Sequence, residues 1–362
     1  MLTADLPGKT TTCWWLVVVL WAQLSGCATF PDGELLSFDG HRSTEIENVP
    51  FFSQRRQQCG AAALATVLSY QGADVSAREL EDFVYLPGRE GAVSIELMAQ
   101  TRRHGMLAHK LNGEMEGLLS ELDAGNPVVV LQNLGFDWLP QWHFAVVVGY
   151  DLPEKTLILR SGNIRRKEEA MKTFYATWRR SGFWGMVALP PEKIPETATL
   201  LSFMKAASDL EQVGRLRAAR QAYLSALARW EGKENIETVR LGLANLAYQQ
   251  GDYHAARDWL VTSIDNGSVS PVTWNNLAYV MLAQQCHKQA LKAAGCAVSL
   301  AERSFGEERS FGEERSYGED LYQESYNDIR SSVLAVMAAD QYDGSTSSQE
   351  TCAIPVCEAP PD

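Results

Sequence analysis

Residues 54–68 read Gln-Arg-Arg-Gln-Gln-Cys-Gly-Ala-Ala-Ala-Leu-Ala-Thr-Val-Leu, and this stretch decides the fold of the first part of the chain. A cysteine followed by a run rich in alanine and leucine predicts a helix that begins at Cys59 and ends near Tyr70. The unpaired backbone N–H groups of a first helical turn and the helix dipole favour an anion. Since the thiolate is the nucleophilic form of cysteine, Cys59 is a candidate for covalent catalysis.

A nucleophilic cysteine needs a base, and His143 is the best candidate for that role. It stands near the start of the apolar run Trp-His-Phe-Ala-Val-Val-Val-Gly-Tyr-Asp at residues 142–151, which predicts a strand. Taken alone, Cys59 would more often be a core residue, and His143 a structural residue of its strand. Taken together, the two motifs favour a catalytic pair.

The two motifs, Gln-x4-Cys-Gly-x-Ala-Ala-Leu-Ala-x-Val-Leu and His-Phe-Ala-Val-Val-Val-Gly-Tyr-Asp, resemble cysteine peptidase family thirty-nine. These are papain-like enzymes that cut bacteriocin leaders after a double glycine. The resemblance covers roughly residues 48–190 and implies that Cys59 is the nucleophile, His143 its partner and Gln54 an oxyanion-hole donor. The family glutamine usually stands one position earlier, where this chain has Ser53. We favour Gln54 because an amide can donate to a developing oxyanion.

A third residue is expected to orient His143, and here the sequence departs from the family. The family has an aspartate after the next strand, whereas residues 159–163 of this chain read Leu-Arg-Ser-Gly-Asn. Ser161 stands near the expected place, and Asn163 could accept a hydrogen bond through its amide oxygen. Neither side chain carries a charge that would stabilise an imidazolium. Reduced activity, or an inactive fold that only binds peptides, therefore stays open.

Length and charge limit the other functions. The 362 residues predict more than one domain, and the formal net charge of −13 argues against a nucleic-acid partner. Many double-glycine peptidases precede an ATP-driven exporter, but this sequence has no G-x-x-x-x-G-K-[ST] loop and hence no predicted ATP site. We predict no metal or cofactor, because the other histidines lack metal-binding spacing. They are His41, His104, His109, His254 and His287.

The first 26 residues read as a lipoprotein signal peptide. Lys9 precedes an apolar core at residues 14–21 that is too short to span a bilayer. The sequence Leu-Ser-Gly-Cys at residues 24–27 resembles a bacterial lipobox, which implies that Cys27 is lipidated and becomes the mature N-terminus. Ala28 in place of aspartate is the pattern of Gram-negative outer-membrane lipoproteins. We therefore expect a lipid-anchored protein of the bacterial cell envelope that faces the periplasm, the alternative being an ordinary secretory signal.

A peptidase domain is predicted over residues 48–190, after a tether at residues 27–47. Helical patterns come first and β-type runs follow, which is the papain-like order. In the helix expected at residues 94–103, Ile95, Met98 and Ala99 are spaced to face the Cys59 helix. The further expected helices begin near residues 76 and 113, and the expected strands cover residues 128–131, 144–149, 156–159 and 185–189.

Beyond a proline-rich linker at residues 191–199, the pattern is helical. Aligning Gly214, Gly251 and Gln285 gives spacings of 37 and 34 residues, with small and large apolar positions recurring in register. Residues 200–303 therefore resemble tetratricopeptide repeats, which commonly hold a protein partner; the alternative is a generic helical bundle.

The end of the chain is expected to be less regular. A six-residue repeat of acidic composition covers residues 304–320, residues 321–343 could form a closing helix, and residues 344–362 read as a disordered tail. Four cysteines, Cys286, Cys296, Cys352 and Cys357, could pair in three ways in an oxidising periplasm.

The sequence thus predicts an α+β papain-like cysteine peptidase domain followed by an all-α domain of tetratricopeptide-like repeats. The expected function is membrane-anchored hydrolysis of peptide bonds in a peptide or protein substrate through a Cys-His thiolate mechanism. A preference for small residues such as a double glycine is implied by the resemblance. The alternative is a weak or inactive peptidase fold that serves, with its repeats, as a binding scaffold.

Overall fold

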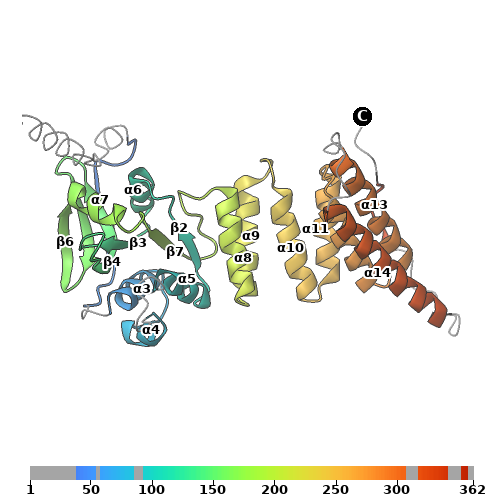
Figure 1. The fold of residues 1–362 in the computed structure, drawn as a ribbon, viewed down its shortest axis with the longest axis horizontal. Coiled ribbons are helices and arrows are strands. Elements are labelled where there is room, and N and C mark those ends of the chain that lie inside the picture. Colours follow the sequence, from blue (N-terminus) through green and yellow to red (C-terminus); the bar gives the residue numbers. More distant parts are fainter. Residues whose placement is uncertain (1–37, 54–57, 85–92, 307–316, 341–351, 358–362) are drawn as a thin grey trace, which may run out of the picture.

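The protein has an α+β domain at one end and a row of helices that extends from it (Figure 1). The structure is a computed structural model that describes residues 38–53, 58–84, 93–306, 317–340 and 352–357. The predicted order, a papain-like α+β domain followed by a helical region, is confirmed. No helix within the described ranges is both long enough and apolar enough to cross a membrane.

An antiparallel sheet is the scaffold of the α+β domain. Within the described residues it has seven strands, in the order β2-β7-β3-β4-β5-β6, with β1 pairing with β4. Because β4 contains the run that carries His143, this residue lies near the middle of the sheet. The strands are β1 (Ser43–Glu45), β2 (Leu107–Lys110), β3 (Val128–Asn133), β4 (Trp142–Asp151), β5 (Thr156–Ser161), β6 (Ile164–Ala170) and β7 (Gly185–Leu189).

Five helices accompany this sheet in the part of the chain that the structure describes. They are α3 (Cys59–Tyr70), α4 (Ala77–Val84), α5 (Val93–Arg103), α6 (Met115–Asp123) and α7 (Met171–Arg179). The first three lie together on one side of the strands (Figure 1). Helix α3 is buried from Gly60 to Leu68 and packs against α4, α5 and β4. A helix that is apolar on all sides belongs in a core, which is why α3 forms the centre of this domain.

Two sequence expectations about this domain need correction. The predicted tether at residues 27–47 reaches too far, because β1 pairs with β4 with Ser43 opposite Asp151. The predicted buried face of α5 is only partly right: Met98 packs against the core, but Ile95 is 67% exposed, and Leu97 is buried instead. The i, i+3, i+4 spacing fits more than one face of a helix, and only the packing partners select between them.

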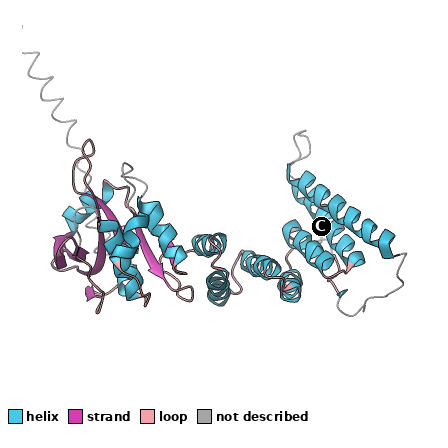
Figure 2. Ribbon diagram, turned by 90° about the horizontal axis from the view of Figure 1, so that it is seen from below, coloured by secondary structure: helices cyan, strands magenta, loops and turns pink. Residues whose placement is uncertain are grey.

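In the described residues of the helical region there are three consecutive helix pairs and a last helix. Figure 2 shows the helices beyond the strands as successive pairs. The helices are α8 (Leu200–Gln212), α9 (Leu216–Trp230), α10 (Glu237–Gln249), α11 (Tyr253–Asp265), α12 (Pro271–Ala283), α13 (His287–Gly306) and α14 (Tyr317–Asp340). Helix α14 overlaps the closing helix predicted at residues 321–343, but it begins at Tyr317, within the predicted six-residue repeat.

The turns within the three pairs are alike. Gly214, Gly251 and Gln285 have φ values of 74°, 77° and 63°, and the residue after each donates a backbone hydrogen bond to the carbonyl five positions earlier. This is the Schellman arrangement, in which a left-handed residue ends a helix. The three positions aligned from the sequence thus have the same conformation, which favours a repeat. The assignment to the tetratricopeptide family stays a prediction.

Two disulfides hold residues of the predicted tail against the helical region. Cys286 pairs with Cys352 and Cys296 pairs with Cys357, which selects one of the three possible connectivities. The predicted disorder of residues 344–362 therefore does not hold for residues 352–357. Residues 307–316, the centre of the six-residue repeat, lie outside the described residues.

The predicted linker at residues 191–199 is part of a packed junction. Thr197 donates to Oε1 of Glu121 in α6 through its backbone N–H, at 2.9 Å, and through its hydroxyl, at 2.7 Å. Arg102 of α5 forms a 2.5 Å ion pair with Asp209 of α8, and both side chains are mostly buried. Leu107 packs into the apolar core of the helical region. The two domains are thus joined by specific contacts.

Candidate active site

Cys59 is the first residue of α3 and, among the described residues, the cysteine that is not in a disulfide. The residues that follow it are buried, whereas Cys59 itself is partly exposed. No acidic residue lies in the first turn of α3, so no carboxylate there opposes a thiolate. The sulfur therefore stands where the buried helix reaches the surface, at the end that favours negative charge.

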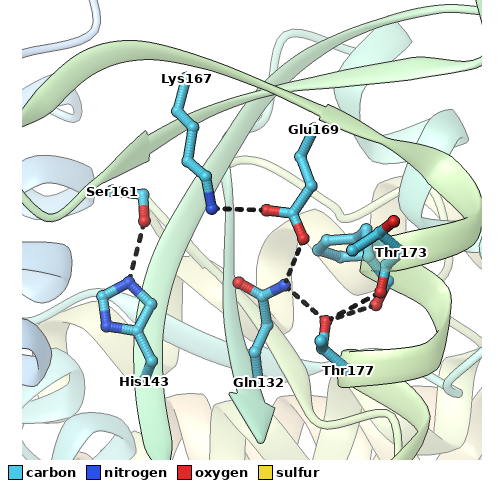
Figure 3. A network of polar contacts seen from close by, with 8 residues as sticks. Gln132, His143, Ser161, Lys167, Glu169, Thr173 and Thr177 are labelled. Carbon is cyan, nitrogen blue, oxygen red and sulfur yellow. Dashed lines mark hydrogen bonds and ion pairs between the residues drawn. The ribbon is translucent and has the colours of Figure 1, made fainter. Parts of the chain in front are cut away.

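His143 is the second residue of β4, the strand against which α3 packs. Its Nε2 lies 2.9 Å from the Oγ of Ser161, which is the last residue of β5 and is buried. Figure 3 shows that the other ring nitrogen, Nδ1, points away from Ser161 and from Gln132. One nitrogen is thus held by a neighbouring strand, and the other is left to exchange a proton.

Asn163, the second candidate for the third residue, makes a different contact. Its Oδ1 accepts a hydrogen bond of 2.7 Å from the hydroxyl of Ser53. Asn163 lies in the turn between β5 and β6, and Ser53 lies in the segment that leads to Cys59. This bond ties the turn to that segment. Of the two candidates, Ser161 is therefore the one in contact with the imidazole.

A buried polar network lies beside His143 (Figure 3). Lys167 and Glu169 of β6 form an ion pair of 2.8 Å, in which the Glu169 side chain is 7% exposed. Gln132, which is opposite His143 in the sheet, donates through Nε2 to Glu169, at 3.3 Å, and to the hydroxyl of Thr177, at 2.7 Å. Lys167 and Gln132 thus engage the Glu169 carboxylate.

These surroundings disfavour a positive charge on His143. Burial lowers the pKa of His143 below its ordinary value, the Lys167 ammonium lowers it further, and Glu169 opposes the shift. The Ser161 hydroxyl has no charge to stabilise an imidazolium. The resting imidazole is therefore neutral at pH 7, which is the form that can accept a proton from a thiol.

The comparison with known families covers this site. Residues 46–186 match the Peptidase_C39 like family. The N-terminal domain is a C39-like peptidase domain. The match contains Cys59, His143 and Ser161, and it ends in β7, before the helical region begins. No curated protein matches this chain.

Two solved structures are similar to the C39-like domain, each at 18% sequence identity. One is a protein of Bacillus anthracis described as a C39-like peptidase; the TM-score is 0.36, and the match covers 42% of this chain and 99% of that one. The other is the peptidase domain of Streptococcus ComA, described as a bi-functional ABC transporter involved in a quorum-sensing pathway. Its TM-score is 0.33, with 40% of this chain and 99% of that one covered.

The C39-like domain brings some of the predicted site residues together. His143 and Ser161 are hydrogen-bonded, and Cys59 and His143 lie on packed elements, although no hydrogen bond joins these two among the described residues. In unliganded enzymes such pairs are often further apart than in the complex with substrate. Gln54 and Cys27 lie outside the described residues. The oxyanion-hole and lipid-site assignments therefore stay predictions.

Three residues beside the site were not found from the sequence: Gln132, Lys167 and Glu169. Strand β6 reads Ile-Arg-Arg-Lys-Glu-Glu-Ala, a composition typical of a solvated strand. The available signal was the spacing of two between Lys167 and Glu169, which places both side chains on one face of a strand. That pattern does not say whether the face is buried.

Proposed function

We propose that this protein is a cysteine peptidase in which Cys59 attacks a peptide carbonyl and His143 takes and returns the proton. One observation carries the proposal: Ser161 holds His143 through Nε2, on a strand that packs against the helix beginning with Cys59. The neutral imidazole favoured by burial and by Lys167 supports the same role, because a base must be unprotonated to act.

The proposed reaction has two stages. The Cys59 sulfur forms a bond to the carbonyl carbon while its proton passes to His143 and the carbonyl electron pair moves to oxygen. Collapse breaks the C–N bond, the amine leaves with the proton from His143, and a thioester remains. A water molecule then attacks the thioester, with His143 again as base, and releases the acid and the Cys59 thiol. We assign the backbone N–H of Cys59 and the Gln54 amide to the oxyanion.

The proposed chemistry is tested on the full-length protein with a peptide vinyl sulfone that ends in Gly-Gly. We expect labelling at Cys59 many times faster than that of free cysteine at the same pH, and no labelling of Cys59→Ala. The labelled residue is identified by mass spectrometry. The proposal is wrong if Cys59→Ala is labelled equally, or if the wild type reacts only above about pH 8.5, the ordinary pKa of a thiol.

A non-catalytic function has one observation in its favour. The hydroxyl on His143 is uncharged, and Lys167 and Gln132 engage the carboxylate of Glu169. Among the described residues, the imidazolium that forms during proton transfer therefore has no carboxylate hydrogen-bonded to it, although Glu169 lies near enough to favour its charge. A protein that binds Gly-Gly peptides without hydrolysing them, and whose Cys59 reacts no faster than free cysteine, would be such a binding scaffold.

We also propose that Cys27 is lipidated and anchors the protein in the bacterial outer membrane. The two disulfides support an oxidising compartment such as the periplasm. Cys27→Ser should abolish metabolic labelling with a fatty acid and move the protein out of the membrane fraction, because several acyl chains give stable attachment. Unchanged fatty-acid labelling in this variant would exclude Cys27 as the lipid site.

A further inference from the structure

The connection between β3 and β4 exposes an unusual number of large apolar side chains. We call residues 134–141 the aromatic hairpin. Phe136 is 64% exposed, Trp138 79%, Leu139 56% and Leu134 45%. The Phe136 and Trp138 rings stack with centroids 5.6 Å apart and planes 9° from parallel. A contiguous exposed apolar patch of this kind commonly marks a binding surface.

The aromatic hairpin is held in a defined shape. Phe136 and Leu139 exchange two backbone hydrogen bonds of 3.1 Å. At its base, the Asn133 side-chain oxygen accepts from the backbone N–H of Gly135, at 3.0 Å, and of Gln141, at 2.9 Å. Arg180 of the loop after α7 donates to the Asn133 carbonyl, at 2.9 and 3.1 Å. The exposed rings therefore sit on a preorganised support, which lowers the entropic cost of binding.

The aromatic hairpin is continuous with the strand that carries His143. Leu139 precedes His143 by four residues, and at about 3.3 Å per residue its backbone is at most about 13 Å from that of His143. An extended peptide covers the same distance with about four residues. A substrate bound at His143 can therefore reach the stacked rings with a side chain close to its scissile bond.

We propose that the aromatic hairpin binds an apolar side chain of the substrate peptide within about four residues of the bond that is cut. The inference rests on the proposed peptidase function and specifies its substrate class. A lipid surface fits less well. In the sequence, Asp137 stands between Phe136 and Trp138, and the hairpin has no Lys or Arg. The chain has a formal net charge of −13, whereas membrane-surface segments usually present basic residues to anionic lipids.

The proposal is tested with internally quenched peptides that have a central Gly-Gly. One reference peptide has serine at the four flanking positions on each side, and further peptides carry a single leucine at one of these positions. We expect the full-length protein to prefer leucine at one or two positions by about tenfold in kcat/KM. The double variant F136A/W138A should lose this preference mainly through a higher KM, because uniform binding is removed.

The control is Leu201→Ala, which removes an apolar side chain that is 81% exposed on α8, in the helical region. This variant should keep the leucine preference. The proposal is overturned if the wild type shows no leucine preference, or if F136A/W138A retains it. In a Cys27→Ser background, which removes the proposed lipid anchor, loss of sedimentation of F136A/W138A with phosphatidylcholine vesicles, with the leucine preference retained, would assign the hairpin to a lipid surface instead.

Labelling of Cys59 with iodoacetamide distinguishes a failure of this inference from a failure of the proposed peptidase function. A parallel loss of Cys59 labelling and of leucine preference in F136A/W138A would mean that the hairpin supports the fold of the site, which overturns the proposal. If wild-type Cys59 reacts no faster than free cysteine, the peptidase function fails, and this inference fails with it. Fast labelling without leucine preference overturns the inference alone.

Discussion

Replacing His143 with alanine should lower kcat for peptide hydrolysis by roughly a thousandfold or more. The imidazole must both accept the thiol proton and deliver this proton to the leaving amine. Ser161 holds the imidazole in place through Nε2. The measurement is turnover of a quenched Gly-Gly peptide by the wild type and by His143→Ala. The matched control is His104→Ala, because His104 is exposed and bonds to the Gln100 carbonyl of its own helix.

The pH dependence gives the same prediction a second readout. Burial and Lys167 lower the pKa of His143, so its imidazole stays neutral down to a lower pH than an ordinary histidine. The acid limb of wild-type turnover should therefore lie below about pH 6.5, the usual histidine value. Labelling of Cys59 in His143→Ala should lose this limb, because the imidazole that titrates there is absent. An unchanged pH profile in this variant would remove His143 from the mechanism.

Two features of the site have opposite effects on a thiolate-imidazolium pair. The N-terminal end of α3 favours a negative charge on the Cys59 sulfur. Lys167, and the absence of charge on Ser161, disfavour a positive charge on His143. The neutral thiol and imidazole should therefore be more populated in this site than in an enzyme whose third residue is an aspartate. Proton transfer then accompanies attack on the substrate rather than preceding it.

The parts that sequence reasoning placed correctly depend on local patterns. The helix at Cys59 and the strand at His143 follow from short runs of suitable residues. The positions Gly214, Gly251 and Gln285 were aligned by spacing, and each proves to be the left-handed residue that ends a helix. Such signals lie within one element and its cap, so a short stretch of sequence is enough to predict them.

The parts that were missed depend on packing between distant segments. Strand β6 looks solvated, yet Glu169 is buried because Gln132, 37 residues earlier, and Thr177 of α7 supply its surroundings. Ile95 has the right spacing for a core position, but it is exposed. Likewise, the choice between Ser161 and Asn163 required knowing that Ser53 bonds to the latter.

Ser161→Ala should lower kcat by roughly tenfold or more with little change in KM, because the hydroxyl holds the imidazole and does not contact the peptide. Asn163→Ala should have a smaller effect, since Asn163 bonds to Ser53 and not to His143. Both variants remove a single hydrogen bond from the hairpin formed by β5 and β6, so each is the control for the other. The measurement is kcat and KM for one quenched Gly-Gly peptide.

Ser161→Asp tests the physical reason behind that loss. A carboxylate beside the imidazole favours its charged form and so raises the pKa of His143, opposing the effects of burial and Lys167. The acid limb of turnover should therefore move to higher pH in Ser161→Asp, and turnover above that limb should rise because the imidazolium formed during proton transfer is stabilised. If Ser161→Ala and Asn163→Ala both keep wild-type turnover, and Ser161→Asp shifts neither rate nor pH profile, Cys59 and His143 act as a dyad. The Ser161 hydrogen bond would then contribute to the fold and not to the chemistry.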